Sequence, residues 1–463
     1  MFKSIVQTVA AGALTAGLCV VALSSCSGPA SPFDGESIKK LPEFVGLNFP
    51  AEAAALRSDS IDLYVDYSTC VAEASGSPFY QAVQPAIIDA APTFYSIKGN
   101  AITKETDDKQ QIFALLRTIK EVNNADLKTA VQNIVNGDRQ AILLTDAEYF
   151  MKGVTGDNLN NPYLADHFRN WMSKGNDLYI YCEPYIESGK FSKYRYYMIF
   201  TDDRIADNFH DRFRKSLGSA VSGYKMYHLS NKPYETLAFD SSYPIVDQNL
   251  SLNTDSRMTP AKDGVDMQEY MTDWKNINKY LLAEAVNAMG NPVPGGLPLL
   301  RGIYLKASPS DAYKVTGVDV KVYQLTPAYM QYLDSVQANG SLLPAEAFDE
   351  VRDLLTINKK VFDESGEIML QLDEKMDGTT LLADGNPNLL KVDFVVTDAV
   401  ENLSGNDDMA GMFKWQSIQS ANEGRFNTSL YESIRQALIN DSVNPRNRKN
   451  NVIYTIYLNT CNL

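Results

Sequence analysis

Two short apolar runs, residues 61–66 and 141–145, each lead into a carboxylate and are separated by helical patterns. Such runs, bounded by polar residues, are typical of parallel strands that are buried on both faces. In an open α/β sheet, the side chains just beyond the carboxyl ends of the strands line the ligand crevice. We therefore expect Asp66, Ser68, Asp146 and Glu148 to converge at one edge of a sheet.

Helical and strand-like patterns alternate through the first half of the chain. In the helical segments, apolar residues recur at three- and four-residue spacing, and Pro78 is well placed to open the first of them. The expected helices are 78–88, 108–122, 127–135 and 163–172, and the further strands are 93–97, 177–185 and 194–203. This alternation predicts an α/β doubly wound domain over residues 57–218.

Beyond residue 218 the pattern changes to short strands separated by turn residues. Residues 315–323 alternate between apolar and polar side chains, as a half-exposed antiparallel strand does. The expected strands are 224–229, 302–306, 315–325, 357–362, 367–372, 389–397 and 452–458, and the expected helices are 267–289, 345–355 and 430–439. Residues 219–463 are thus predicted to form a mostly β, sandwich-like region with helical insertions and a C-terminal helix and strand.

The N-terminus has the features of an export signal. A single basic residue, an apolar middle and small residues precede Cys26, as in a signal peptide that is removed. The sequence Leu23-Ser-Ser-Cys26 resembles the bacterial lipobox, which implies that residues 1–25 are cleaved and that lipid is attached to Cys26. Residues 26–56 would then form a lipidated N-terminus and tether. The alternative is an uncleaved anchor helix, but no basic stop-transfer cluster follows.

The charge balance narrows the class of partner. The chain has 57 acidic and 42 basic residues and a formal net charge of -15. Such a chain lacks the basic footprint of nucleic-acid binding and is repelled by anionic lipid, which leaves the acyl chains as the main membrane attachment. We expect a cell-envelope protein on the outer membrane, with the membrane face left open. Three Asp-Ser-aliphatic triplets, which resemble the O-glycosylation acceptor of Bacteroidales, fit a Bacteroidetes-like source: 59–61, 334–336 and 441–443.

Few cysteines remain once the N-terminal segment is set aside. Cys70, Cys182 and Cys461 cannot all pair within one molecule, and no CxxC spacing indicates a zinc site. A bond between Cys70 and Cys182 is one interpretation. The other is that both are small buried apolar groups.

The strand-end residues of the first domain resemble the von Willebrand factor A family. Its metal-ion-dependent adhesion site begins with Asp-x-Ser-x-Ser after the first strand and ends with an aspartate after a later strand. Asp66-Tyr-Ser-Thr-Cys70 matches the aspartate and the first serine, and Thr145-Asp-Ala-Glu148 matches the later segment. The resemblance implies a protein-binding domain with Asp66, Ser68 and Asp146 around Mg²⁺, an ion that prefers oxygen ligands.

Two departures separate this chain from the family pattern. Cys70 stands in place of the second serine, and a thiol is a poor ligand for a hard cation. Residues 123–126 are Asn-Asn-Ala-Asp, where the family has a threonine. The site is therefore expected to be a degenerate adhesion site, either still able to bind metal or retained only as part of the fold.

Further side chains are candidates for contact with a protein partner at the same acidic edge. They are Tyr67, Glu148, Glu183 and Asp202. The alternative explanation for the carboxylates is that they are solvated groups at loop starts.

No HExxH, GxSxG or Gly-rich phosphate motif accompanies the three histidines. The leading hypothesis is a non-catalytic lipoprotein that binds another envelope or extracellular protein. The alternative is a metal-dependent hydrolase that uses Asp66 and Asp146.

Overall fold

The fold described here is that of a computed structural model of the 463-residue chain. The residues it describes are 37, 40–90, 92–119, 125–148, 159–219, 224–234, 236–239, 265–269, 280–285, 297–373, 388–416 and 424–461. The predicted signal peptide and Cys26 lie outside them. Within the described part of the chain, no helix is both long and apolar enough to cross a membrane.

A seven-stranded sheet organises the first half of the molecule, with the strand order β3-β2-β1-β4-β6-β5-β7. Strand β1 lies between β2 and β4 and is parallel to both, as the two buried apolar runs predicted. The strands are β1 (Arg57–Asp66), β2 (Thr93–Lys98), β3 (Ala101–Thr106), β4 (Arg139–Thr145), β5 (Asp177–Glu187), β6 (Phe191–Thr201) and β7 (Lys225–Leu229). The α/β fold class is thereby confirmed.

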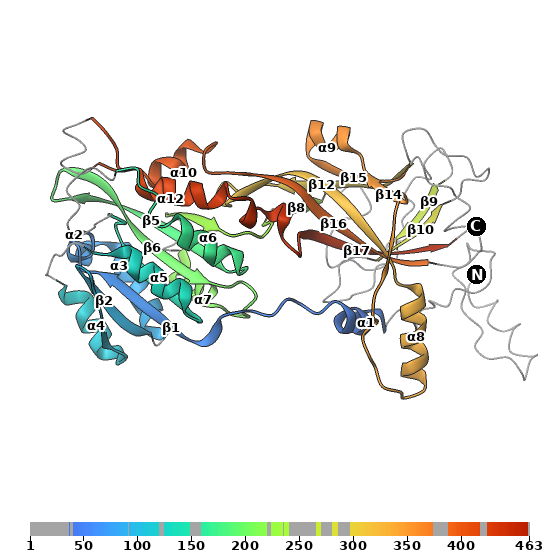
Figure 1. The fold of residues 1–463 in the computed structure, drawn as a ribbon, viewed down its shortest axis with the longest axis horizontal. Coiled ribbons are helices and arrows are strands. Elements are labelled where there is room, and N and C mark those ends of the chain that lie inside the picture. The colour runs from blue at the N-terminus through green and yellow to red at the C-terminus, as the bar shows by residue number, and fades with distance from the viewer. Residues whose placement is uncertain are drawn as a thin grey trace, which may run out of the picture.

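Helices cover both faces of this sheet (Figure 1). One face packs on α5 (Leu127–Asn136) and α6 (Ala165–Ser173), and the other on α3 (Pro78–Asp89), α4 (Lys109–Thr118) and α7 (Phe209–Leu217). The helix starts are set by local side chains: Asp126, for example, accepts a hydrogen bond from the Thr129 backbone at the first turn of α5. Because both faces are covered, the middle of the central strand β4, residues 141–144, is apolar and buried.

The doubly wound prediction fails beyond β4. Strands β5 and β6 form an antiparallel hairpin, and β6 then lies antiparallel to β4. Ser188 and Gly189 both have positive φ at the tip of that hairpin, where the Lys190 N–H donates to the Glu187 carbonyl. This two-residue turn reverses the chain at once, so no crossover helix separates the two strands.

The domain boundary predicted after Gly218 also needs correction. Strand β7 pairs antiparallel with β5 and forms an edge of the seven-stranded sheet. The α/β unit therefore extends past residue 218, to at least Leu229.

The second half contains two further sheets. They share one hydrophobic core with α5 and α6, the helices on one face of the seven-stranded sheet. One sheet has the order β13-β12-β16-β17-β10-β9 and the other β14-β15-β11-β8. Their strands are β8 (Thr236–Phe239), β9 (Val265–Glu269), β10 (Tyr280–Ala285), β11 (Leu297–Lys306), β12 (Tyr313–Gln324), β13 (Asp349–Val351), β14 (Leu355–Ile357), β15 (Glu367–Leu372), β16 (Asn388–Glu401) and β17 (Val452–Cys461). Almost all pairings are antiparallel; β10 and β17 are parallel.

Two helices predicted for this region are wrong. The described parts of 267–289 are the strands β9 and β10, and 345–355 contains β13 and the start of β14. Helix α8 (Thr326–Gln337) was not predicted, and the strand predicted at 357–362 is wrong, because α9 (Lys359–Ser365) occupies most of it. Helix α8 packs on α1 (Leu41–Asn48), within the segment predicted to be a tether, and Phe44 meets Tyr329 there with ring centroids 5.1 Å apart.

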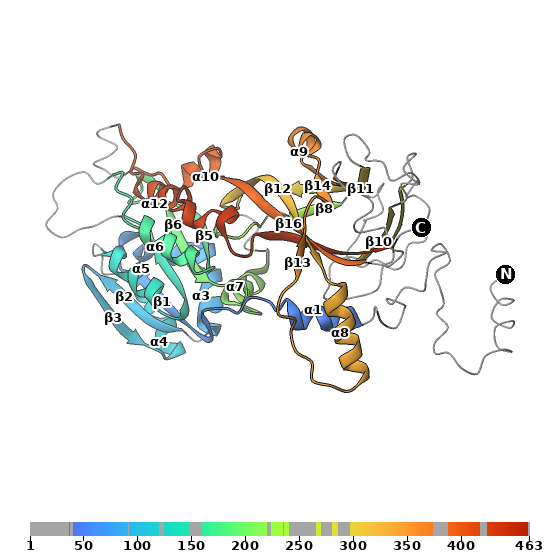
Figure 2. The same ribbon diagram turned by 45° about the vertical axis from the view of Figure 1, so that its right-hand side comes forward.

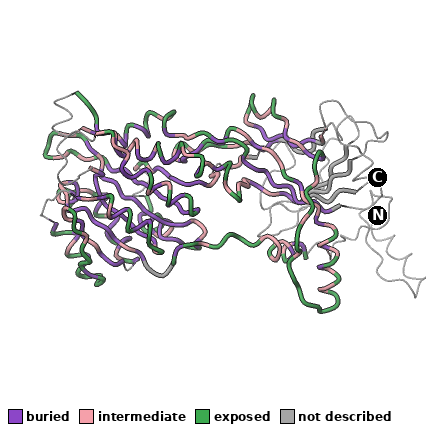
Figure 3. Tube along the Cα trace, viewed as in Figure 1, coloured by how far each residue is buried: buried purple, intermediate pink, exposed green. Residues whose placement is uncertain are grey.

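The C-terminal helices return to the α/β half. In Figures 1 and 2, α12 (Ser429–Leu438) lies beside α6, and α10 (Asp407–Met412) lies at the same end of the long strands β12 and β16. The contact is specific, since the Leu164 N–H donates 3.2 Å to Ser433 Oγ and the Tyr196 hydroxyl donates 2.7 Å to the Met412 carbonyl. One cluster of buried residues accordingly has members in both halves, and Figure 3 shows buried segments in each.

Candidate functional site

The carboxyl ends of β1 and β4 lie next to one another because these strands are parallel neighbours. Asp66 is the last residue of β1 and Thr145 the last of β4. Thr145 Oγ1 donates a 2.7 Å hydrogen bond to Asp66 Oδ2. The predicted convergence of Asp66 with the 145–148 segment is thus present.

A tight turn after β4 fixes Asp146. Ala147 has a φ of 59°, in the left-handed backbone region that residues other than glycine seldom adopt. Its N–H donates 2.9 Å to Thr145 Oγ1, and the next N–H, of Glu148, donates 3.0 Å to Asp146 Oδ1. The strained turn therefore holds one oxygen of Asp146 in place.

Cys70 completes a cluster of three donors with Asp66 and Asp146. It is the second residue of the short helix α2 (Thr69–Ala72), and one ligand atom from each of the three residues lies within 4.8 Å of the others. Ser68, predicted as a ligand, has its Oγ 3.1 Å from Cys70 Sγ. The cluster could hold a metal ion.

The two carboxylates are almost completely removed from water. Asp66 is 2% exposed and Asp146 3%. Burial raises the pKa of Asp66 to about 7, although the nearby hydroxyls of Thr145 and Ser68 oppose the rise. Burial and the nearby charges of Glu148 and Asp66 raise the pKa of Asp146 well above its usual range. Bare carboxylates are therefore costly here, and the site favours a proton or a cation.

A basic side chain near the site, Lys193, forms ion pairs with other carboxylates. Lys193 forms ion pairs with Glu148 and with Glu187, the latter at 2.6 Å, and its ammonium lies over the Trp415 ring. The Glu148 side chain is 41% exposed and lies at the rim of the site. Neither Asp66 nor Asp146 forms an ion pair of its own among the described residues.

Glu183 lies near this edge but is buried. It accepts hydrogen bonds from Arg195 Nη1 at 2.6 Å and from the Tyr197 hydroxyl at 2.7 Å, and Ser77 Oγ also donates to it. Tyr67 is buried as well, with the Lys98 ammonium 4.4 Å from its ring centroid. Both residues are thus structural groups under the edge rather than accessible contacts.

Asp202 lies at the opposite end of the sheet. It follows β6, which runs antiparallel to β4, so its neighbours are residues at the amino end of β4. Arg204 Nε donates 2.8 Å to Asp202 Oδ1. The expectation that Asp202 joins the edge with Asp66 was wrong because it assumed parallel strands throughout.

No family model, curated protein or solved structure matches the chain.

A second buried polar cluster surrounds Asp177, the first residue of β5. This cluster was not predicted from the sequence, because its members are far apart in the chain and follow no motif. Asp177 Oδ1 lies 3.2 Å from His228 Nε2 and accepts a 2.7 Å hydrogen bond from the Tyr234 hydroxyl, while Lys232 donates to Oδ2. Asp203 is joined to the cluster through the same Tyr234 hydroxyl, at 3.0 Å.

His228 connects this cluster to the β-rich half of the molecule. The backbone N–H of His228 donates a 2.8 Å hydrogen bond to the Ser310 carbonyl, and the ring atom Nδ1 lies 3.9 Å from Asp311 Oδ1. Burial lowers the pKa of His228, but the neighbouring carboxylates of Asp177 and Asp311 outweigh burial and raise it to about 8. Burial opposes a charged Asp177 too, yet His228 and Lys232 hold the Asp177 pKa below its usual range. The cluster supplies its own counter-charges.

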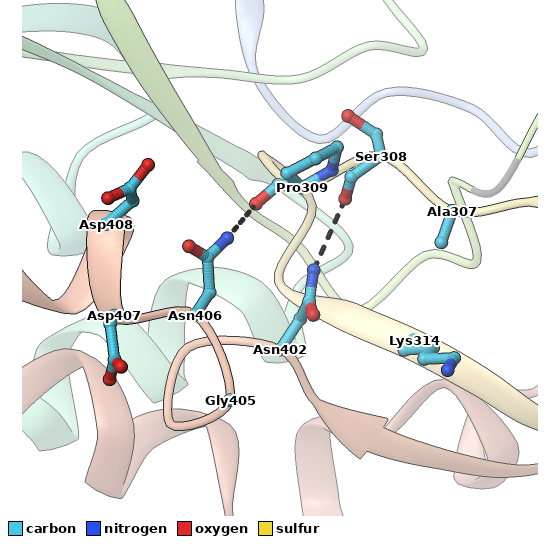
Figure 4. Close-up of a pocket in the computed structure, with 9 residues that line it drawn as sticks. All are labelled: Ala307, Ser308, Pro309, Lys314, Asn402, Gly405, Asn406, Asp407 and Asp408. Atoms are coloured by element: carbon cyan, nitrogen blue, oxygen red, sulfur yellow. Dashed lines mark hydrogen bonds between the residues drawn. The ribbon is translucent and has the colours of Figure 1, made fainter.

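An open polar pocket of about 460 Å³ lies near the same junction, between the segment before β12 and the turn that leads into α10 (Figure 4). Asn402 Nδ2 donates 3.3 Å to the Ser308 carbonyl and Asn406 Nδ2 donates 3.1 Å to the Pro309 carbonyl. The side-chain amides of Asn402 and Asn406 thus form hydrogen bonds between the two walls of the pocket.

Proposed function

We propose that the protein is a lipid-anchored binding protein of a bacterial cell envelope. Its α/β domain, which resembles the von Willebrand factor A family, would contact another envelope or extracellular protein at the Asp66/Asp146 edge through a divalent cation. The observation that carries this proposal is the meeting of Asp66 and Asp146, from two parallel neighbouring strands, in a buried cluster of donor atoms. The site keeps part of the adhesion motif and departs from it at Cys70.

The electrostatics of the edge support a cation. Two clusters that share Asp146 contain the carboxylates of Asp66, Glu148 and Glu187, and the Lys193 ammonium is paired only with Glu148 and Glu187. A divalent ion at Asp66 and Asp146 would offset the burial of both charges. An acidic side chain of the partner would then fill a coordination position that the protein leaves open.

Two observations favour binding over nucleophilic catalysis. In the part of the chain that the structure describes, no hydrogen bond joins a histidine ring to a serine, threonine or cysteine side chain. Glu148, in turn, has an exposed side chain at the rim of the site, where a partner protein could reach it.

The cation is tested by calorimetric titration of the full chain with Mg²⁺, Mn²⁺ and Zn²⁺. Heats of binding are expected for at least one ion, and they should be absent in Asp66→Asn and in Asp146→Asn. Asp203→Asn is the matched control because it alters a separate acidic cluster, the one with Asp177 and His228. At about 100 times its dissociation constant, the ion should also stabilise the protein by roughly 2.7 kcal/mol. Equal heats in wild type and Asp66→Asn would remove the cation from the proposal.

The remaining parts of the proposal need separate experiments. Cys26→Ser should abolish labelling by a fatty-acid analogue and release the protein from the membrane fraction, whereas retention of both would exclude the anchor. Screening against phosphodiester, ester and peptide substrates addresses the hydrolase alternative. Turnover that is lost in both Asp66→Ala and Asp146→Ala would replace the binding function with catalysis.

A further inference from the structure

The thiol of Cys70 lies in the same buried cluster as the two carboxylates of the proposed cation site. We infer that Cys70 is the third protein ligand of this site and selects a thiophilic divalent cation, with Zn²⁺ as the type, over Mg²⁺. The inference rests on the proposed cation site and specifies its ligand set and its ion. With the Cys70 thiol at the position where the adhesion motif has a serine hydroxyl, the site would favour Zn²⁺ over Mg²⁺.

The position of Cys70 is fixed from two sides. Its side chain is fully buried, and Arg195 Nε donates 2.6 Å to its backbone carbonyl. Arg195 is itself held by Glu183, through the 2.6 Å bond described above. The Ser68 hydroxyl lies 3.1 Å from Cys70 Sγ, where it can donate to a metal-bound thiolate as a group of the outer shell. The segment after β1 therefore directs sulfur at the carboxylates.

A second observation independently indicates a missing ligand. Asp66 Oδ1 is buried and has no hydrogen-bond partner among the described residues, while Oδ2 accepts from Thr145. A buried carboxylate oxygen without a hydrogen-bond partner destabilises the folded protein. Zinc binds oxygen and sulfur at about 2.0–2.3 Å, which brings tetrahedral ligand atoms to roughly 3.5 Å from one another. Donors that already lie within 4.8 Å need only a small movement to reach that geometry.

The chemistry of the donors decides the class of ion. Mg²⁺ requires near-octahedral oxygen ligands and retains several waters, which a buried thiol disfavours. Zn²⁺ accepts thiolate and carboxylate together and leaves a fourth position for water or a partner side chain. Binding forms the metal–sulfur bond and releases the thiol proton to solvent.

The other candidate clusters do not offer these conditions. At Asp177, the Lys232 ammonium and the His228 ring already occupy the carboxylate oxygens. At Glu148 and Glu187, the Lys193 ammonium takes the same role. Of the three acidic clusters in the described residues, only the one with Cys70 lacks a basic side chain bonded to its carboxylates.

Cobalt substitution tests the ligand directly, because Co²⁺ bound to thiolate gives a charge-transfer absorption in the near ultraviolet. The full chain is stripped with a chelator and titrated with Co²⁺. We expect the band in wild type and in Cys182→Ser, which removes the other described free thiol, and no band in Cys70→Ser. Added Zn²⁺ should displace Co²⁺ and abolish the band, whereas added Mg²⁺ should leave the band unchanged. The Zn²⁺ affinity of Cys70→Ser should fall about 100-fold or more, since loss of an outer-shell group alone costs 10–100-fold.

Zinc X-ray absorption covers the case in which Cys70→Ser fails to fold. In the double variant Cys182→Ser and Cys461→Ser, a zinc–sulfur distance of about 2.3 Å supports the inference. A coordination shell of oxygen and nitrogen alone overturns it. Mg²⁺ binding that depends on Asp66 without any sulfur contact overturns the inference and leaves the proposed function standing. Absence of any divalent binding removes both.

Discussion

Thr145 Oγ1 and Asp66 Oδ2 are joined by a 2.7 Å hydrogen bond between residues that are 79 positions apart. The same hydroxyl accepts the N–H of Ala147, so it couples the end of β1 to the turn that carries Asp146. A buried hydroxyl with both a donor and an acceptor partner is fixed in its rotation. The geometry of the candidate site therefore depends on one small side chain.

Replacement of Thr145 by valine should destabilise the protein by about 1.5–3 kcal/mol, because a buried carboxylate loses a hydrogen bond. Chemical denaturation measures the change in the free energy of unfolding. Thr201→Val is the control: its buried hydroxyl donates 2.6 Å to the neutral amide oxygen of Gln140 at the opposite end of the sheet. A smaller loss, of about 1 kcal/mol, is expected there. Equal losses would show that the charge of Asp66 is unimportant.

The stability of the protein should depend on pH through His228. Its folded pKa of about 8 lies above the unfolded value of 6.5. Its contribution is thus fully present below pH 6.5 and is lost as the pH rises through 8. A rise of between one and two pKa units corresponds to about 2 kcal/mol. Thermal unfolding of wild type and His228→Gln across this window should give melting temperatures that differ most at the acidic end.

His210 provides a contrast of opposite sign. Its ring stacks on Tyr179, with centroids 3.4 Å apart, and burial lowers its pKa to about 3. The neutral ring stabilises the fold above pH 6.5, and that contribution is lost as the pH falls from 6.5 towards 3. His210→Gln should therefore weaken the acid sensitivity and leave the alkaline loss unchanged. An identical pH profile for both histidine variants would contradict the two assignments.

Cys70 and Cys182 should not form a disulfide bond with each other. They belong to the hydrophobic cores on opposite faces of the seven-stranded sheet, and both are buried. Burial also raises the pKa of each thiol, which suppresses the reactive thiolate. Peptide mapping after alkylation should find neither residue labelled in the native protein and both labelled after unfolding without reductant. Recovery of a Cys70–Cys182 peptide would refute the sheet arrangement.

Two buried tyrosines give a matched test of the contact between the halves of the molecule. Tyr196 donates to the Met412 carbonyl, whereas the Tyr227 hydroxyl has no hydrogen-bond partner in the described part of the chain. Tyr196→Phe leaves a buried carbonyl unsatisfied and should cost about 1–3 kcal/mol. Tyr227→Phe removes an unsatisfied polar group and should be neutral or stabilising. Calorimetric unfolding of both variants measures the difference, and a larger loss for Tyr227→Phe would contradict it.

The parallel part of the fold could be predicted because buried apolar runs and intervening helices define β1, β2 and β4. The meeting of Asp66 and Asp146 then follows from the shared direction of neighbouring strands. Strand direction beyond β4 could not be read from hydrophobic pattern, since β5 and β6 are equally apolar in either direction. The Ser188-Gly189 pair was the available signal, as two residues with positive φ are typical of a hairpin turn.

The Asp177 cluster and the role of Cys70 lay beyond sequence reasoning for another reason. Asp177, Asp203 and His228 come together only because β5 runs antiparallel to β6 and β7, which no local pattern specifies. Cys70 was identified as a departure from a family motif, but its distance from the carboxylates depends on the turn into α2. Glu183 followed a strand as expected, yet its burial depends on Arg195, twelve positions away.

The packing of α12 on α6 also has a consequence for the order in which the protein matures. The apolar surface of α6 is made early in synthesis, but the helix that covers it, Ser429–Leu438, is made much later. This surface therefore cannot be covered until α12 has been synthesised. A nascent or truncated chain that ends before residue 429 would expose it and be prone to aggregation, so the α/β half depends for its final packing on a segment made long after its own strands and helices.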